Sequence, residues 1–347
     1  MKRNGATIVS SPVADPLPFT VDCLEYSKPD RARFEEWRRG SVGCVHVTIA
    51  VWETARETLS VIGEWNDLFA ANSDLIEQAH GVADITRINA AGKTAVLFGF
   101  QNTTPLEDDI RLVRVFADLG VRIMQLTYNT QNSIAAGCWE DDDNGVSKHV
   151  GANFIKEMND VGVLIDLSHC SERTCLDTID MSAAPVAVTH ANPIEFVGDG
   201  VELSRRPKST EVLRKLAGRG GVVGLSPYVR MLRDGAATTL DSFVDMTLWT
   251  IDQLGVEHVA FGTDFYTGYD ASMVKWWRAG RWGRESPIPI GDGPVVEWPS
   301  WFSSPEAFPG VLEALVDRGL SRDELALVAG GNWMRLFEQG FQPAVRA

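Results

Sequence analysis

The chain has 347 residues, of which 44% are hydrophobic and 23% are charged, so extended disorder and collagen-like repeats are excluded. The formal net charge of −15 argues against binding to nucleic acid or to an anionic membrane surface, because those partners are themselves negative. No apolar run reaches the roughly 20 residues of a membrane span, and residues 1–18 lack the apolar core of a secretory signal. Together with five cysteines that show no C-x-x-C spacing, these features predict a cytoplasmic protein with reduced thiols.

Short β-branched, apolar runs alternate with amphipathic stretches along the whole chain, which predicts repeated strand–helix units. Strands are expected at 19–24, 44–51, 94–100, 121–126, 161–166, 185–189, 221–225 and 258–262. Helices are expected at 53–80, 106–119, 152–159, 171–181, 209–217 and 242–254, and Ser321 with Glu324 forms a capping box before another. Several strands are continuously apolar, as in VGVLIDL, which is typical of parallel strands buried on both faces.

Eight such units predict a single (β/α)8 (TIM) barrel domain over residues 1–347. The alternative is an open, doubly wound sheet, which would carry a glycine-rich phosphate-binding turn after the first strand. That strand ends in VDCLEYS, without glycine, and this favours the barrel. Two long loops, 127–150 and 265–304, are expected over the active-site face. The second is rich in tryptophan and proline and forms either a wall of the pocket or a lid or subunit contact without chemistry.

Catalytic side chains of barrel enzymes lie where the strands end. Two of the six histidines, His169 and His190, follow neighbouring predicted strands, and Asp264 follows the eighth. Converging neutral imidazoles predict a divalent-cation site, with Asp264 as a further ligand or a general base. His46 lies inside an apolar strand and is interpreted as a core or rim residue.

Five segments in order, IDLSHCSERT, APVAVTHANP, RGGVVGLS, GTDF and AGGNWMRLF, resemble the membrane (renal-type) dipeptidase family of the amidohydrolase superfamily. The resemblance covers about residues 19–337. It implies a barrel of the metallo-dependent hydrolase type, a homodimer, and a binuclear zinc site that cleaves dipeptides. It makes His169 and His190 metal ligands and Asp264 the proton-transfer group. Arg206, or alternatively Arg205, would hold the substrate carboxylate, although either arginine could instead face solvent.

The sequence departs from the family pattern after the first strand. The resemblance implies a His-x-Asp pair of metal ligands there, but Leu24 and Tyr26 occupy those positions. A shift by one residue would offer Cys23 and Glu25, which could ligate a metal, but that shift turns the pair to the other face of the strand.

Two further family positions are changed. Gln101 stands where the resemblance implies a bridging glutamate, and Tyr128 stands where it implies a substrate-binding histidine. Two zinc ions about 3.5 Å apart need anionic ligands to offset their repulsion. We therefore expect at most one divalent cation, zinc or another, held by His169 and His190 with Gln101 or Asp264; a site without metal is the other outcome.

Three functions stay open from the sequence. The first is a divergent hydrolase that acts on a small dipeptide-like or amino-acid-derived amide. In it, Asp264 and Tyr128 act on the reacting groups, and Arg206, Arg205 and Tyr128 bind the substrate. The second is a lyase or isomerase that acts on a small carboxylate in the same pocket. The third is a decayed, non-catalytic barrel that binds a ligand. Each predicts a small-molecule partner.

Overall fold

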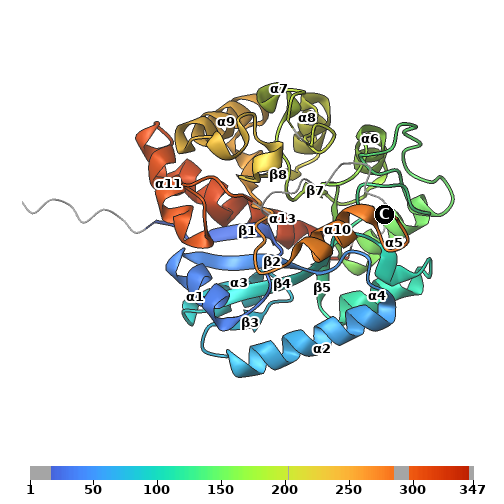
Figure 1. Ribbon diagram of the computed structural model, residues 1–347. Coiled ribbons are helices and arrows are strands. Elements are labelled where there is room, and N and C mark those ends of the chain that lie inside the picture. Colours follow the sequence, from blue (N-terminus) through green and yellow to red (C-terminus); the bar gives the residue numbers. More distant parts are fainter. Residues whose placement is uncertain (1–16, 202, 285–296, 344–347) are drawn as a thin grey trace, which may run out of the picture.

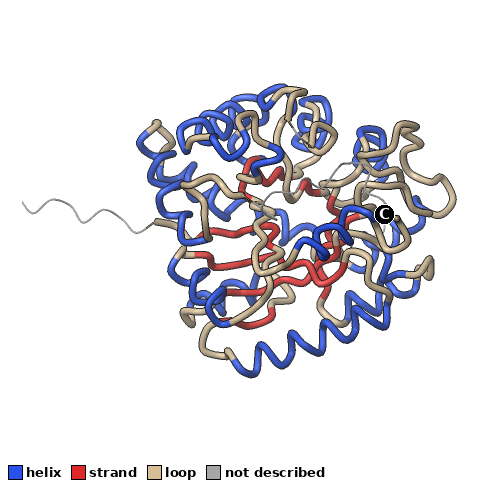
Figure 2. The backbone as a smooth tube through the Cα atoms, in the orientation of Figure 1, coloured by secondary structure: helices blue, strands red, loops and turns tan. Residues whose placement is uncertain are grey.

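The computed structural model describes residues 17–201, 203–284 and 297–343 (Figure 1). In this part of the chain, helices surround a central set of strands (Figure 2). The strands are β1 (Thr20–Glu25), β2 (Val42–Ala50), β3 (Ile76–Gln78), β4 (Thr94–Phe100), β5 (Val121–Gln125), β6 (Leu164–Asp166), β7 (Ala187–Val188), β8 (Val222–Leu225) and β9 (Val259–Phe261). The α-helices are α1 (Arg31–Arg39), α2 (Ala55–Ala71), α3 (Val82–Ala90), α4 (Arg111–Asp118), α5 (Gly151–Val161), α6 (Glu172–Met181), α7 (Ile194–Val197), α8 (Thr210–Gly218), α9 (Leu240–Leu254), α10 (Ala271–Ala279), α11 (Phe308–Asp317), α12 (Arg322–Ala326) and α13 (Asn332–Gly340).

The strands close into a barrel. Among the described residues, the hydrogen-bonded order is β2–β1–β9–β8–β7–β6–β5–β4–β3, and β2 also pairs with β4. This additional pairing joins the ends of the series, so eight parallel strands form the closed barrel and β3 pairs with the start of β4. The predicted (β/α)8 barrel is confirmed, and the open doubly wound sheet is excluded.

The strands are buried on both faces, as their continuous apolar runs predict. Side chains that fill the barrel interior include Val21, Cys44, Ala95, Leu97, Ile123, Leu164, Ala187, Val222 and Ala260. The alternate positions pack outward beneath the helices and include Val45, Val47, Val96, Phe98, Val223 and Phe261. The polar side chains that line the functional site lie at the strand ends, although a few polar residues, such as Asp22 and His46, are buried within the strands.

The predicted helix 53–80 is shorter in the structure. It begins with a capping box formed by Thr54 and Glu57, but it ends at Asn72, whose side-chain amide donates to the carbonyl of Leu68 at 2.9 Å. The chain then forms β3, in which Ile76 pairs with Thr94 of β4. Pairing between distant segments therefore overrides the local helical pattern at this end. The capping box expected at Ser321 is present at the start of α12.

A helix lies inside the predicted loop 265–304. Asp270 caps α10 by accepting the backbone N–H of Met273 at 3.1 Å, and the helix brings Val274, Trp277 and Arg278 to the mouth of the barrel. Residues 285–296 of the predicted loop lie outside the described residues. Across the described ranges, no helix has both the length and the apolar character to cross a membrane.

Candidate active site

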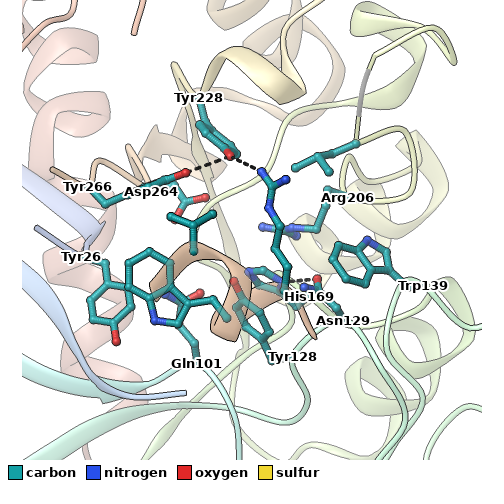
Figure 3. A pocket seen from close by; sticks show the side chains of 14 residues that line it. Tyr26, Gln101, Tyr128, Asn129, Trp139, His169, Arg206, Tyr228, Asp264 and Tyr266 are labelled. Carbon is teal, nitrogen blue, oxygen red and sulfur yellow. Dashed lines mark hydrogen bonds between the residues drawn. The ribbon is translucent and has the colours of Figure 1, made fainter. Parts of the chain in front are cut away.

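A pocket opens at the carboxyl ends of the strands, and side chains from several strand ends converge on it (Figure 3). Its empty volume is about 520 Å³, including the part open to solvent. The lining residues are Tyr26, Gln101, Tyr128, Asn129, Trp139, His169, Leu203, Arg206, Tyr228, Asp264, Tyr266, Val274, Trp277 and Arg278. The structure thus brings most of the predicted site residues to one place.

His169 and His190 face each other beside this pocket, with their Nε2 atoms 3.1 Å apart. The Nδ1 atom of His169 contacts Oδ1 of Asn129 at 2.6 Å. The Nδ1 atom of His190 contacts the Thr189 hydroxyl at 2.8 Å, and that hydroxyl itself donates to Asp166 at 2.7 Å. In each neutral imidazole the proton therefore lies on Nδ1, which donates it to the neighbouring oxygen. The two Nε2 atoms are then unprotonated, and their lone pairs point toward the space between the rings.

The protonation of the two imidazoles suits metal binding. Burial lowers the pKa of both rings well below the ordinary histidine value, and the Arg206 guanidinium lowers it further. Two nitrogens that bind one tetrahedral zinc at 2.0–2.1 Å lie about 3.3 Å from each other, close to the observed separation. The pair therefore fits one shared divalent cation, which would also relieve the repulsion between the facing lone pairs.

Gln101 contributes an unused acceptor to the pocket wall. Its Nε2 atom donates to the Thr48 hydroxyl at 3.0 Å, whereas its Oε1 atom is buried and has no hydrogen-bond partner among the described residues. A buried acceptor without a donor costs about 1–3 kcal/mol. Gln101 shares the pocket lining with His169, so its oxygen is an acceptor available to a bound group in this pocket.

Leu24 and Tyr26 do not supply further ligands. Leu24 is apolar and fully buried. The Tyr26 ring packs against Trp277 with centroids 4.7 Å apart, and burial raises the pKa of its phenol well above the ordinary value, so the hydroxyl stays protonated. A neutral phenol is a poor metal ligand, and this end of the site lacks the charge that a second cation needs.

The shifted pair, Cys23 and Glu25, lies outside the pocket lining. Glu25 is bound by Trp37 of α1, whose Nε1 atom donates to Oε2 at 2.5 Å. Cys23 is fully buried in the barrel interior, with its Sγ atom 4.0 Å from Nδ1 of His46. In the described part of the chain, no three His, Cys, Asp or Glu side chains are grouped to hold a metal. The described residues thus present two facing histidines and lack the cluster of carboxylates that a binuclear centre needs.

Asp264 occupies a strained position in the pocket. Its φ angle is +57°, in the left-handed region that non-glycine residues rarely adopt, and its backbone N–H donates to the carbonyl of Leu24 at 2.9 Å. Burial raises the pKa of its carboxyl group to about 7, against the opposing effect of Arg206. A carboxyl group with this pKa can both accept and return a proton near neutral pH.

The two adjacent arginines have different positions. Arg206 is 2% exposed and lines the pocket. Its guanidinium donates to the carbonyls of Ser168 and His190, so the backbone holds it in place. Arg205 forms an exposed ion pair with Asp141 at 2.6 Å and lies outside the pocket lining. Of the two candidates for carboxylate binding, only Arg206 reaches the pocket.

Tyr128 contacts His169 through its ring. The ring stacks on His169, with centroids 4.1 Å apart and an interplanar angle of 24°. This contact fixes the plane of the His169 imidazole and thus the direction of its Nε2 lone pair. Tyr128 can therefore position the His169 imidazole. The catalytic and substrate-binding roles that the sequence predicts for Tyr128 remain predictions.

His46 is a core residue, in line with its interpretation from the sequence, but its polar atoms are poorly satisfied. Its Nε2 atom is buried without a hydrogen-bond partner among the described residues. A Cβ atom on Gly99 would lie 1.9 Å from this Nε2 atom, so the glycine makes room for the ring.

Sequence reasoning gave no role to Asn129 and Arg278, which both line the pocket. Asn129, at φ +62°, accepts from His169 and fixes its tautomer. Arg278 reaches the pocket from α10, a helix inside a segment expected to be a loop. The pattern in ASMVKWWRA could have identified it, because Val274, Trp277 and Arg278 are three and four residues apart and share one helix face.

Comparison with known proteins identifies the family. Residues 20–276 match the family described as Membrane dipeptidase (Peptidase family M19). The dipeptidase tcpJ of Claviceps purpurea is 26% identical over 288 residues, which are 82% of this chain and 60% of that protein. An uncharacterised dipeptidase of Schizosaccharomyces pombe is 33% identical over 180 residues, or 50% of this chain and 42% of that protein. The chain thus spans about half the length of these curated relatives.

Comparison with solved structures also finds similar proteins. An amidohydrolase from Pseudomonas aeruginosa superposes with a TM-score of 0.87 at 32% identity, covering 93% of this chain and 97% of that one. A metallopeptidase from Rhodobacter sphaeroides, liganded with a phosphinate mimic of L-Ala-D-Ala, gives a TM-score of 0.76 at 17% identity, covering 94% and 100%, and shares the fold. Because the family match extends over most of the sequence, this chain belongs to the membrane dipeptidase family, peptidase family M19, of the amidohydrolase superfamily.

Proposed function

We propose that the protein is a hydrolase that cleaves a small dipeptide-like or amino-acid-derived amide in the pocket at the carboxyl end of the barrel. The observation that carries the proposal is the pair of Nε2 atoms of His169 and His190, 3.1 Å apart, with both Nδ1 atoms engaged. Family membership supports hydrolysis as the reaction class.

One divalent cation, zinc or another, completes the proposed site. His169 and His190 would hold it, with the unpartnered Oε1 atom of Gln101 as a further ligand. When bound, such a cation polarises the substrate carbonyl and lowers the pKa of water. The neutral residues at the β1 end, Leu24 and Tyr26, support a count of one cation rather than two.

The chain's own groups supply the remaining steps. A carboxylate oxygen of Asp264 takes a proton from the attacking water and returns it to the leaving nitrogen, which its pKa of about 7 permits. Arg206 binds a substrate carboxylate with the N–H groups that the backbone carbonyls leave free. The rings of Tyr26, Tyr128 and Trp277 line the walls and limit access of bulk water.

Metal content and amide hydrolysis measured on the same preparations test this function. We expect the purified protein to bind about one zinc per chain and to hydrolyse at least one member of a panel of L,L- and L,D-dipeptides and N-acyl amino acids. His169→Gln and His190→Gln should each lose the zinc and the activity. His149→Gln, at an exposed histidine, is the matched control and should keep both. Asp264→Asn should keep the zinc and lose about 10²–10⁴-fold in rate.

Other results would contradict the proposal in separate ways. Two zinc ions per chain would overturn the metal count. Zinc binding without hydrolysis, but with conversion of a carboxylate substrate to an isomer or an elimination product, would identify the lyase or isomerase alternative. Neither zinc nor turnover would indicate a non-catalytic barrel.

A further inference from the structure

Arg278 has an unused charge inside the pocket. Its side chain is 7% exposed, and its Nη1 atom is buried without a hydrogen-bond partner among the described residues. Within residues 17–201, 203–284 and 297–343, the guanidinium forms a single, long hydrogen bond, from Nη2 to the Tyr228 hydroxyl at 3.4 Å. No carboxylate within the described ranges forms an ion pair with it. A buried charge in this state is costly unless a ligand completes its contacts.

The pocket as a whole has more donors and positive charge than acceptors. Among the described residues that line the pocket, Arg206 and Arg278 face a single carboxyl group, that of Asp264. The Nε1 atom of Trp139 is a second buried donor that has no hydrogen-bond partner in the described part of the chain. This local excess is opposite to the net charge of −15 carried by the whole chain. The pocket therefore complements a ligand that is rich in acceptor oxygens and negatively charged.

Aromatic rings form much of the pocket wall. The pocket is lined by four tyrosines and two tryptophans: Tyr26, Tyr128, Tyr228, Tyr266, Trp139 and Trp277. Several of them pack on one another, as Tyr266 does on Trp277 in an edge-to-face contact with centroids 5.5 Å apart. Such walls favour a planar, apolar ligand body. The two arginines exclude the other common occupant of an aromatic cage, an organic cation.

We propose that Arg278 is a specificity residue that binds an anionic group of the substrate, so that the pocket selects small amides carrying both a carboxylate and an aromatic ring. The guanidinium of Arg278 donates to the substrate carboxylate together with Arg206, in place of its long contact with Tyr228. The ring of the ligand lies between the aromatic walls. This assignment rests on the proposed function for the amide, but the recognition of the anion and the ring is independent of turnover.

Equilibrium binding to the metal-depleted full-length protein tests the assignment without requiring catalysis. Hippurate, which combines a benzoyl ring, an amide and a carboxylate, is compared with hippuramide, which lacks only the charge, and with N-acetylglycine, which lacks only the ring. Tryptophan fluorescence or calorimetry reports the affinity. We expect hippurate to bind at least about tenfold tighter than hippuramide, since a desolvated charge pair carries at least that discrimination. N-acetylglycine should bind more weakly than hippurate.

Arg278→Gln should lower hippurate affinity by about tenfold or more while leaving hippuramide binding unchanged, and Arg278→Lys should recover part of the loss. Retained hippuramide binding shows that the variant is folded. Lys275→Gln removes the same charge from the exposed face of α10 and should leave both affinities unchanged. Equal binding of hippurate and hippuramide, no hippurate binding, or an equal effect of Lys275→Gln would each overturn the assignment. Because metal and turnover are absent from this assay, its failure leaves the metal and hydrolysis measurements to decide the proposed function separately.

Discussion

The barrel rim has two parts, at β6–β7 and at β1–β9, in which an aspartate binds a threonine in the same way. The functional side chains that follow the two threonines differ. At the end of β6, Asp166 accepts the backbone N–H and the hydroxyl of Thr189 at 2.9 and 2.7 Å. Within β1, Asp22 accepts the backbone N–H and the hydroxyl of Thr263 at 2.8 and 2.6 Å. Each aspartate thereby ties its own strand to the residues that follow the neighbouring strand.

The groups that these contacts support differ. On the β6–β7 side, Thr189 is followed by His190, which faces His169 across 3.1 Å. On the β1–β9 side, Thr263 is followed by Asp264, which shares the rim with Leu24 and Tyr26 instead of further ligands. The support of the barrel rim is therefore the same whether the threonine is followed by a histidine or by an aspartate, so the functional side chains of one part can change while both parts stay supported.

The largest expected effect is a loss of zinc affinity when the Thr189 hydroxyl, which connects His190 to Asp166, is removed. Thr189→Val keeps the shape of the side chain but removes the hydroxyl between His190 and Asp166. Loss of such an outer contact lowers metal affinity by about 10–100-fold. Zinc affinity measured by competition with a chelator checks this. The same substitution at Thr263 removes the matching hydroxyl from the β1–β9 side and should leave zinc affinity nearly unchanged; equal losses in the two variants would contradict the comparison.

A second prediction concerns Gln101, which stands where the family resemblance implies a negatively charged glutamate. Gln101→Glu places a carboxylate where the unpartnered Oε1 atom lies, and the Thr48 hydroxyl, which accepts from Gln101 Nε2, can rotate to donate to it. A carboxylate is a stronger zinc ligand than an amide oxygen, so zinc affinity should rise by about tenfold or more. Gln101→Met, of similar volume and without a strong ligand atom, should lower it. Chelator competition on the three proteins would refute the role of Gln101 if all three affinities agreed.

Acid stability tests the buried histidine of the β1–β2 side. Burial lowers the pKa of His46 to about 3, so between about pH 6.5 and 3 the unfolded chain binds a proton that the folded chain does not. Stability from this group is present above pH 6.5 and is lost by about 1.4 kcal/mol per pH unit as the pH falls. His46→Gln should reduce the pH dependence of unfolding by urea over this range by about that slope. His149→Gln, at an exposed position, should leave it unchanged; a wild-type slope in His46→Gln would show that His46 is protonated in the folded protein.

The smallest expected effect is at Tyr128, where two variants distinguish the contribution of the ring from that of the hydroxyl. The ring stacks on His169, so Tyr128→Leu should lower stability by about 0.5–1.5 kcal/mol and weaken zinc binding. Tyr128→Phe keeps the stacking and should change neither. If Tyr128→Phe nevertheless lowers the rate of amide hydrolysis, the hydroxyl contacts the substrate, as the sequence predicts.

Much of the fold could be predicted from the sequence because its signals are local. Runs such as VGVLIDL are buried on both faces wherever they pair, so their composition predicts parallel strands in a barrel. Capping residues such as Ser321 fix a helix start through contacts three residues away. The boundary at residues 72–78 was wrong because β3 forms only through pairing with β4, and no local pattern describes that contact.

The sequence by itself determined the barrel, the family and the two histidines, because strand order carries His169 and His190 to one rim in any eight-stranded parallel barrel. Only the tertiary structure decided that their Nε2 atoms meet at 3.1 Å, that Gln101 keeps an unpartnered oxygen, and that Arg278 reaches the pocket from α10. The physical reason is the separation along the chain between the residues that interact. Burial and hydrogen bonding within a few residues fix which element a segment forms. The direction of a side chain, and whether its polar atoms find partners, depends on groups from distant segments that meet only when the barrel closes.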